Sequence, residues 1–138
     1  MAPTLLIIDD NPSVRDSLRF LFMRRGYAVF VAENGPKGIA IAAESRIDGA
    51  LVDVNMPEMN GVEVCRLLRE QATARGQNIV IWMMTGARTV ELTRRALEAG
   101  ALALLGKPFD FAELFRQFDE KLGPPAPLPK PPDVLDEL

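Results

Sequence analysis

The stretch LLIIDDNPS, residues 5–13, decides how the fold is read. Its first four side chains are all apolar, which is typical of a strand buried on both faces of a sheet. Two adjacent carboxylates, Asp9 and Asp10, follow directly. Asn11 and Pro12 then match the N-cap and the first residue of a helix. The stretch therefore predicts a buried strand, two like charges directly after it, and a helix that begins within two residues of them.

Apolar runs typical of strands alternate with amphipathic segments along the rest of the chain. Strands are expected at 5–8, 27–32, 49–54, 79–84 and 102–106, and helices at about 12–25, 35–45, 60–74, 88–100 and 110–122. Mostly apolar strands that alternate with helices predict an α/β fold with a doubly wound, five-stranded parallel sheet. In such folds ligands bind beyond the carboxyl ends of the strands.

Composition narrows the class of protein. The 138 residues are 48% hydrophobic and 25% charged, with a net charge of -3, so there is no electrostatic case for binding nucleic acid or an anionic membrane. The single cysteine, Cys65, excludes an internal disulfide and fits a reducing compartment. No signal peptide and no stretch long enough to span a membrane is present. We therefore expect a soluble cytoplasmic protein.

Histidine is absent from the sequence. This excludes Ser-His-Asp and Cys-His catalysis, histidine-ligated zinc and a phosphohistidine carried by this chain. Its chemistry must therefore depend on carboxylates, hydroxyls and lysines.

The composition changes after Gly123. The run PPAPLPKPP, residues 124–132, holds six of the eleven prolines and is incompatible with helix or sheet. We expect a folded domain over 1–123, followed by a proline-rich tail or linker over 124–138. Two interpretations stay open: a stand-alone domain, or one segment of a longer protein with a downstream effector.

Charged and polar side chains stand at the predicted strand ends. Asp9 and Asp10 follow the first strand, and Asp53 lies near the end of the third. If these two strands are neighbours, the three carboxylates share a pocket, and their repulsion raises at least one pKa. A hard divalent cation such as Mg²⁺ removes that repulsion. The alternative, that Asp9 and Asp10 only cap the following helix, is weakened by Asp53, because a carboxylate inside an apolar strand is costly.

Two further strand ends complete a set suited to phosphoryl transfer. Thr85 ends the fourth strand and Lys107 follows the fifth. A carboxylate nucleophile, Mg²⁺, a lysine and a hydroxyl supply the positioning and charge neutralisation that this reaction needs. Asp53 is the expected nucleophile, because Asp9 and Asp10 are better placed to hold the metal. A salt bridge from Lys107 to the acidic cluster is compatible with this role.

These residues resemble the receiver domain of bacterial two-component response regulators over residues 4 to about 122. The resemblance rests on the motifs IIDDNP, LVDVNMPEMNG, MMTGA and GKPF in this order. It implies a flavodoxin-like receiver fold with strand order 2-1-3-4-5. It implies phosphorylation of Asp53 by a sensor histidine kinase or a histidine phosphotransfer protein. Mg²⁺ would be bound by Asp10, Asp53 and the backbone carbonyl of Asn55, with Asp9 acting through water. Thr85 and Lys107 would contact the phosphoryl group, and Lys107-Pro108 would be a cis peptide.

One position departs from the family pattern. The residue three before the lysine is usually an aromatic that swings inward, and here it is Leu104. The usual aromatic readout of the signal is therefore missing, while the phosphorylation site is complete. Ala87, two residues after Thr85, is small and leaves the phosphoryl group open to water or to a partner.

The sequence thus predicts a phosphorylation-dependent signalling switch and not an enzyme. An aspartyl-phosphate phosphatase is disfavoured, since such enzymes place a second aspartate where this chain has Asn55. A pseudo-receiver that only binds proteins is kept open by Leu104. The output partner, and the choice between monomer and homodimer, are not determined by the sequence.

Overall fold

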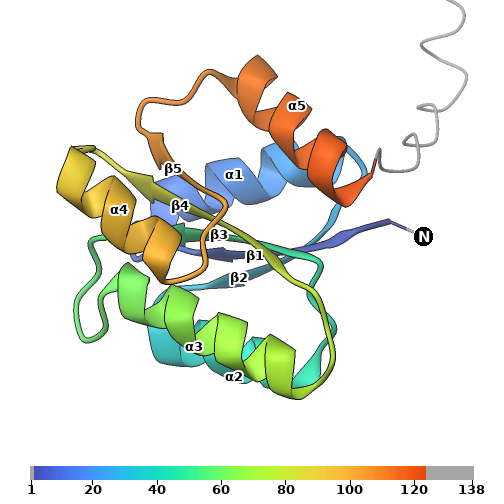
Figure 1. The fold of residues 1–138 in the computed structure, drawn as a ribbon. Coiled ribbons are helices and arrows are strands. Elements are labelled where there is room, and N and C mark those ends of the chain that lie inside the picture. Colours follow the sequence, from blue (N-terminus) through green and yellow to red (C-terminus); the bar gives the residue numbers. More distant parts are fainter. Residues whose placement is uncertain (1, 124–138) are drawn as a thin grey trace, which may run out of the picture.

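The computed structural model describes residues 2–123, which form ten alternating strands and helices (Figure 1). In chain order these are β1 (Thr4–Ile8), α1 (Pro12–Arg24), β2 (Ala28–Ala32), α2 (Gly35–Glu44), β3 (Gly49–Asp53), α3 (Gly61–Ala74), β4 (Val80–Thr85), α4 (Val90–Glu98), β5 (Ala103–Gly106) and α5 (Phe111–Leu122). The predicted elements are all present. The predicted proline-rich tail lies outside the described residues.

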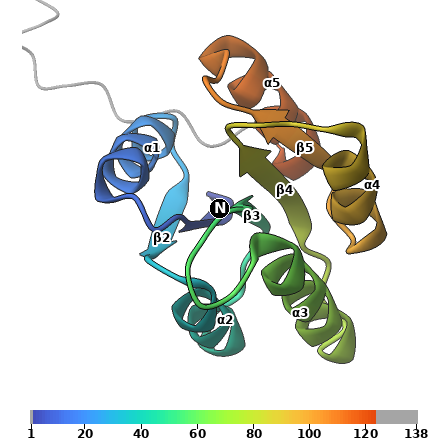
Figure 2. The ribbon, with the colours of Figure 1, turned by 90° about the vertical axis from the view of Figure 1, so that its left-hand side faces the viewer.

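All neighbouring strands pair in parallel, in the order β2-β1-β3-β4-β5. The predicted doubly wound sheet and its strand order are therefore confirmed. Because β1 pairs with both β2 and β3, its carboxyl end lies at the centre of the sheet edge. Figure 2 shows the sheet between α1 and α5 on one side and α2 and α3 on the other. No helix within residues 2–123 is long and apolar enough to cross a membrane.

The first strand is buried on both faces, as its apolar run predicts. Leu5 and Ile7 belong to the core under α1 and α5, whereas Leu6 and Ile8 belong to the core under α2, α3 and α4. All four side chains are fully buried. Each side chain buried in this way stabilises the folded state by roughly 1.5–3 kcal/mol. The strand that leads to Asp9 is therefore packed firmly on both faces.

The start of α4 differs from the expected one. The sequence predicts a helix from residue 88, but α4 begins after Thr89, whose side-chain oxygen accepts a hydrogen bond from the backbone N–H of Leu92 at 3.0 Å. The backbone of Thr89 is extended, so the helix cannot include it and starts at the next residue. Arg88 therefore lies in the loop between β4 and α4 and not in the helix.

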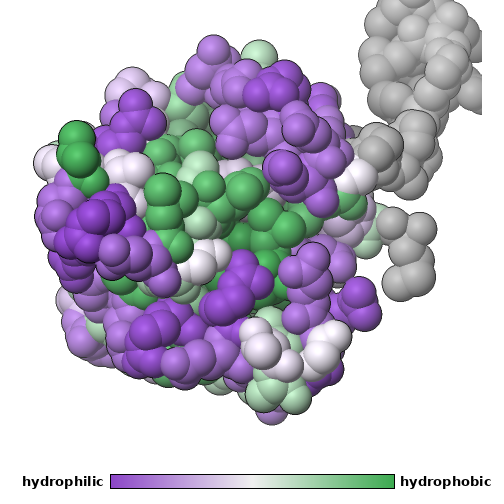
Figure 3. Space-filling model, viewed as in Figure 1, coloured by the Kyte–Doolittle hydropathy of each residue, from purple (hydrophilic) through white to green (hydrophobic). Residues whose placement is uncertain are grey.

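Apolar side chains are exposed on α4 and just before β5. Val90, Leu97 and Leu102 are 89%, 50% and 42% exposed. The surface in Figure 3 shows an apolar area on the side of the molecule that carries α4 and α5.

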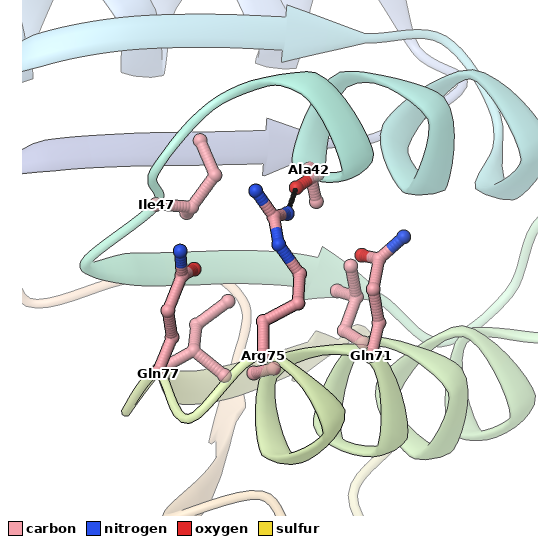
Figure 4. Close-up of a pocket in the computed structure, with 8 residues that line it drawn as sticks. Ala42, Ile47, Gln71, Arg75 and Gln77 are labelled. Atoms are coloured by element: carbon pink, nitrogen blue, oxygen red, sulfur yellow. Dashed lines mark hydrogen bonds between the residues drawn. The ribbon is translucent and has the colours of Figure 1, made fainter.

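The C-terminal end of α2 is held by a side chain from α3. The last turn of α2 contains no basic residue. Instead the Arg75 guanidinium, at the end of α3, donates to the backbone carbonyl of Ala42 at 2.6 Å, as Figure 4 shows. A cation at this position also interacts favourably with the helix dipole.

Removal of this contact is expected to weaken the fold. We predict that Arg75→Met lowers the free energy of unfolding by about 1 kcal/mol, because one hydrogen bond to a helix-end carbonyl is lost. Urea denaturation followed by circular dichroism measures the loss. Arg46→Met is the control, since Arg46 is exposed and only faces Asp48 at 3.7 Å. An equal loss in both variants would contradict the capping role of Arg75.

Candidate functional site

The carboxyl edge of the sheet brings the predicted site residues together. Asp9 follows β1, Asp53 ends β3, Thr85 ends β4 and Lys107 follows β5. One carboxylate oxygen from each of Asp9, Asp10 and Asp53 lies within 4.8 Å of the others. The clustering expected from a parallel sheet is therefore observed.

Lys107 lies between two of these carboxylates. Its Nζ is 3.3 Å from Asp9 Oδ2 and 3.7 Å from Asp53 Oδ1. Asp9 is fully buried and Asp53 is almost so. The ammonium group thus neutralises part of the negative charge at a place where water does little to screen it.

Asp9 is compensated by further contacts that the sequence did not reveal. Its Oδ1 accepts a hydrogen bond from the backbone N–H of Asn11 at 2.9 Å. Its backbone carbonyl accepts one from the Arg15 guanidinium, also at 2.9 Å. Asp10, by contrast, is exposed and makes no salt bridge with any residue between 2 and 123. Asp9 is therefore the fixed member of the pair and Asp10 the accessible one.

Asp53 is the perturbed carboxyl of the site. Burial raises its pKa from an ordinary value of 3.8 to about 6, and the neighbouring charge of Asp9 adds to this rise. Lys107 and a hydrogen bond from the backbone of Asn55 act in the opposite direction without cancelling it. The ionised form of Asp53 is thus poorly stabilised by the protein alone and gains from an added cation.

The three carboxylates fit a small divalent cation. Oxygens on opposite sides of a magnesium ion lie about 4.2 Å apart, close to the observed spacing of the acidic cluster. Carboxylate oxygens are also the ligand type that this ion prefers. Asn55 follows Asp53 by two residues, is exposed, and makes a backbone hydrogen bond to the Asp53 carboxyl.

Thr85, the last residue of β4, is fully buried, and its hydroxyl bonds to the loop that follows. Its Oγ1 accepts a hydrogen bond from the backbone N–H of Ala87 at 3.2 Å. The backbone N–H of Lys107 donates to the carbonyl of Thr85 at 2.8 Å, which holds the ends of β4 and β5 together. The predicted cis peptide between Lys107 and Pro108 is confirmed.

The loop after β3 is closed by Gly61, the last residue of the motif LVDVNMPEMNG. Its backbone N–H donates to the carbonyl of Val54 at 2.9 Å. A Cβ atom at this position would lie 2.1 Å from the backbone oxygen of Asp53. Only glycine lets the first turn of α3 approach the backbone of Asp53 this closely.

Leu104 and Cys65 are both buried. Leu104, at the position where the family usually has an aromatic, is 4% exposed within the core under α4. Cys65 is fully buried on α3, and burial raises the pKa of its thiol to about 11. The thiol therefore stays protonated at neutral pH and serves as a core residue.

A parallel sheet with carboxylates, a lysine and a threonine at its carboxyl edge defines the class of protein. The sequence model of the family described as "Response regulator receiver domain" matches residues 5–119, so the chain belongs to this family. Members of the family typically bind Mg²⁺, and the acidic cluster is present here.

Individual relatives support the family assignment. The chain is 37% identical over 114 residues to the response regulator MprA of Mycobacterium sp. (strain KMS), covering 83% of this chain and 48% of that protein. It thus spans about half the length of the curated relatives it matches. The structure of the chemotaxis protein CheY4 of Vibrio cholerae has a TM-score of 0.81 and 30% identity, over 88% of this chain and 100% of that one.

A further solved structure has the same fold. It is a response regulator protein from Burkholderia pseudomallei, described with a phosphorylated aspartic acid, a calcium ion and citrate. Its TM-score is 0.75 at 25% identity, over 87% of this chain and 66% of that one.

The pKa of Asp53 leads to a pH-dependent prediction. Because the folded state favours the protonated form, the contribution of this group to stability is present below pH 4 and is lost as the pH rises through about 6. In magnesium-free buffer at pH 7.5, Asp53→Asn should therefore raise the free energy of unfolding by about 1–3 kcal/mol. The gain should shrink towards zero near pH 4.

Urea denaturation at several pH values with a chelator present measures this gain. Asp16→Asn is the control for the loss of one carboxylate, since Asp16 is exposed on α1. A loss of stability in Asp53→Asn at pH 7.5, or a gain that is the same at every pH, would contradict the raised pKa.

The tight approach at Gly61 gives a second prediction. Gly61→Ala should lower the free energy of unfolding by about 2 kcal/mol or more, because the new methyl group collides with the backbone of Asp53. Gly106→Ala is the control, since no atom lies within 4 Å of a Cβ at that position. Thermal unfolding of both variants tests the difference, and equal stability would show that the loop shifts freely.

Proposed function

We propose that Asp53 accepts a phosphoryl group from a phosphohistidine of a sensor histidine kinase or a histidine phosphotransfer protein. A carboxylate oxygen of Asp53 attacks phosphorus as the phosphorus–nitrogen bond breaks. The imidazole leaves with the electron pair and takes a proton from solvent. The observation that carries this proposal is the position of Lys107 Nζ, between Asp9 Oδ2 at 3.3 Å and Asp53 Oδ1 at 3.7 Å.

In this proposal Asp10, Asp53 and the backbone carbonyl of Asn55 hold Mg²⁺, and Asp9 acts through water. The bound ion would neutralise the carboxylates and bind a phosphoryl oxygen. The spacing of the acidic cluster supports this assignment. So does the raised pKa of Asp53, because a poorly stabilised carboxylate gains from a bound cation. The Burkholderia relative, with its phosphorylated aspartic acid and calcium ion, is consistent with this assignment.

Lys107 and Thr85 contact the phosphoryl group once it is in place. Lys107 already neutralises negative charge at the edge, and the additional charge on Asp53 strengthens its attraction. The Thr85 hydroxyl accepts from Ala87, so its own proton is available to donate to a phosphoryl oxygen. Phosphorylation then shifts the population between two packings of the α4 region.

The protein acts as a cytoplasmic switch and does not turn over a substrate. Asn55 lacks the carboxylate that an aspartyl-phosphate phosphatase uses as its acid and base. The receiver domain extends over residues 1–123, with 124–138 as a tail or linker. The output passes to a partner protein, to a second copy of the chain or to a downstream effector domain.

Incubation with a small acyl phosphate and Mg²⁺, followed by intact mass measurement, tests the proposal. We expect the mass of one added phosphoryl group, no gain in Asp53→Asn, and a strongly reduced gain in Asp10→Asn or with a chelator. Asp16→Asn, which changes an exposed aspartate of α1 outside the acidic cluster, should react like the wild-type protein. An unchanged wild-type mass, beside a verified receiver that is modified in parallel, would overturn the proposed function.

A further inference from the structure

The segment between β4 and α4, residues 86–89, is hydrogen-bonded both to the end of β4 and to β5. On one side, the backbone N–H of Ala87 donates to the Thr85 hydroxyl at 3.2 Å. On the other, the Arg88 guanidinium donates to the backbone carbonyl of Leu104 on β5 at 3.3 Å. The segment therefore connects the edge that carries Asp53 with the strand beside α4.

The side chain of Leu104 makes no such connection itself. It is buried in the core under α4, where Met83 is its partner on β4, and it has no polar atom that could reach the segment. The polar group that Leu104 offers is its backbone carbonyl, and Arg88 uses it. At this position the connection between the loop and β5 thus depends on an arginine from the loop and not on an aromatic from the strand.

Arg88 is also distinguished from the arginine one turn into α4. Arg94 is held by ion pairs with Glu91 and with Glu98, the latter at 2.6 Å. Arg88 forms no salt bridge with a carboxylate in the part of the chain that the structure describes, residues 2–123. Its bond to the Leu104 carbonyl is therefore not in competition with a stronger ionic partner.

Arg88 lies directly before the N-cap of α4. The next residue, Thr89, is the N-cap of α4 and fixes the first turn through its bond to Leu92. Val90 and Leu97 on the same helix expose apolar surface. A shift of the segment therefore moves the cap and, with it, an exposed apolar helix face.

We propose that Arg88 is the positioning residue that couples the state of Thr85 to α4, in place of an aromatic at position 104. This inference rests on the proposed function of Asp53. When the Thr85 hydroxyl turns to donate to a phosphoryl oxygen, its bond from the Ala87 N–H is altered. The segment moves, the bond between Arg88 and the Leu104 carbonyl is lost, and α4 changes its packing.

Hydrogen exchange of the full chain tests this coupling, with Arg88→Met as the main variant, because methionine keeps an apolar stem but has no donor. Arg88→Lys restores a donor, and Arg94→Met makes the same charge change on α4 without a contact to β5. In unphosphorylated protein we expect the amides at the start of α4, residues 89–93, to exchange several-fold faster in Arg88→Met than in the wild type. Arg94→Met should leave them close to the wild-type rate.

The same proteins are then compared after treatment with acyl phosphate and Mg²⁺, with phosphorylation verified by mass. Arg88→Met should still gain the phosphoryl group but lose most of the exchange change over residues 86–98 that the wild type shows. Arg88→Lys should recover a large part of it. A full wild-type response in Arg88→Met, or an equal loss in Arg94→Met, would overturn the role of Arg88. Wild-type protein that gains no phosphoryl group would instead overturn the proposed function, which the mass reveals before any exchange is measured.

Discussion

Two buried carboxylates, Asp9 and Asp53, share the single ammonium group of Lys107 at the carboxyl edge of the sheet. The protein stabilises the negative charges of these two carboxylates to different extents. Asp9 also accepts a backbone hydrogen bond, whereas Asp53 is left with a raised pKa. The ionised form of such a carboxylate is stabilised by an added cation. The chemistry proposed for the site depends on this uneven compensation more than on any single contact.

The rest of the fold holds these charges at short range against their repulsion. β1 lies between β2 and β3, and its side chains are fully buried on both faces. Gly61 brings α3 against the backbone of Asp53 with no room for a side chain. The end of β5 is fixed to β4 by the bond from the Lys107 N–H to Thr85. Asp53 is therefore carried by a packed strand, and Asp9 follows directly after one.

The carboxyl edge of the sheet and the region around α4 differ in the kind of side chains that they contain. The edge consists of charged and hydroxyl side chains at strand ends, and all the residues that the family resemblance requires are present there. The region around α4 contains exposed apolar residues and the buried Leu104, whose side chain has no polar atom. In the coupling that we propose, the link between them is Arg88, whose guanidinium donates to the backbone carbonyl of Leu104.

The sequence by itself determined the element types, the sheet class and the edge at which the site lies. Apolar runs and the Asn11 cap act over a few residues, so they can be predicted from the sequence, and parallel strands bring their ends together. The strand order, the cis peptide and the metal ligands came from the family resemblance. The tertiary structure alone decided the contacts of Arg15, Arg75, Arg88 and Gly61. Each joins atoms of different segments, and their distances depend on how helices pack on the sheet, which no local pattern specifies.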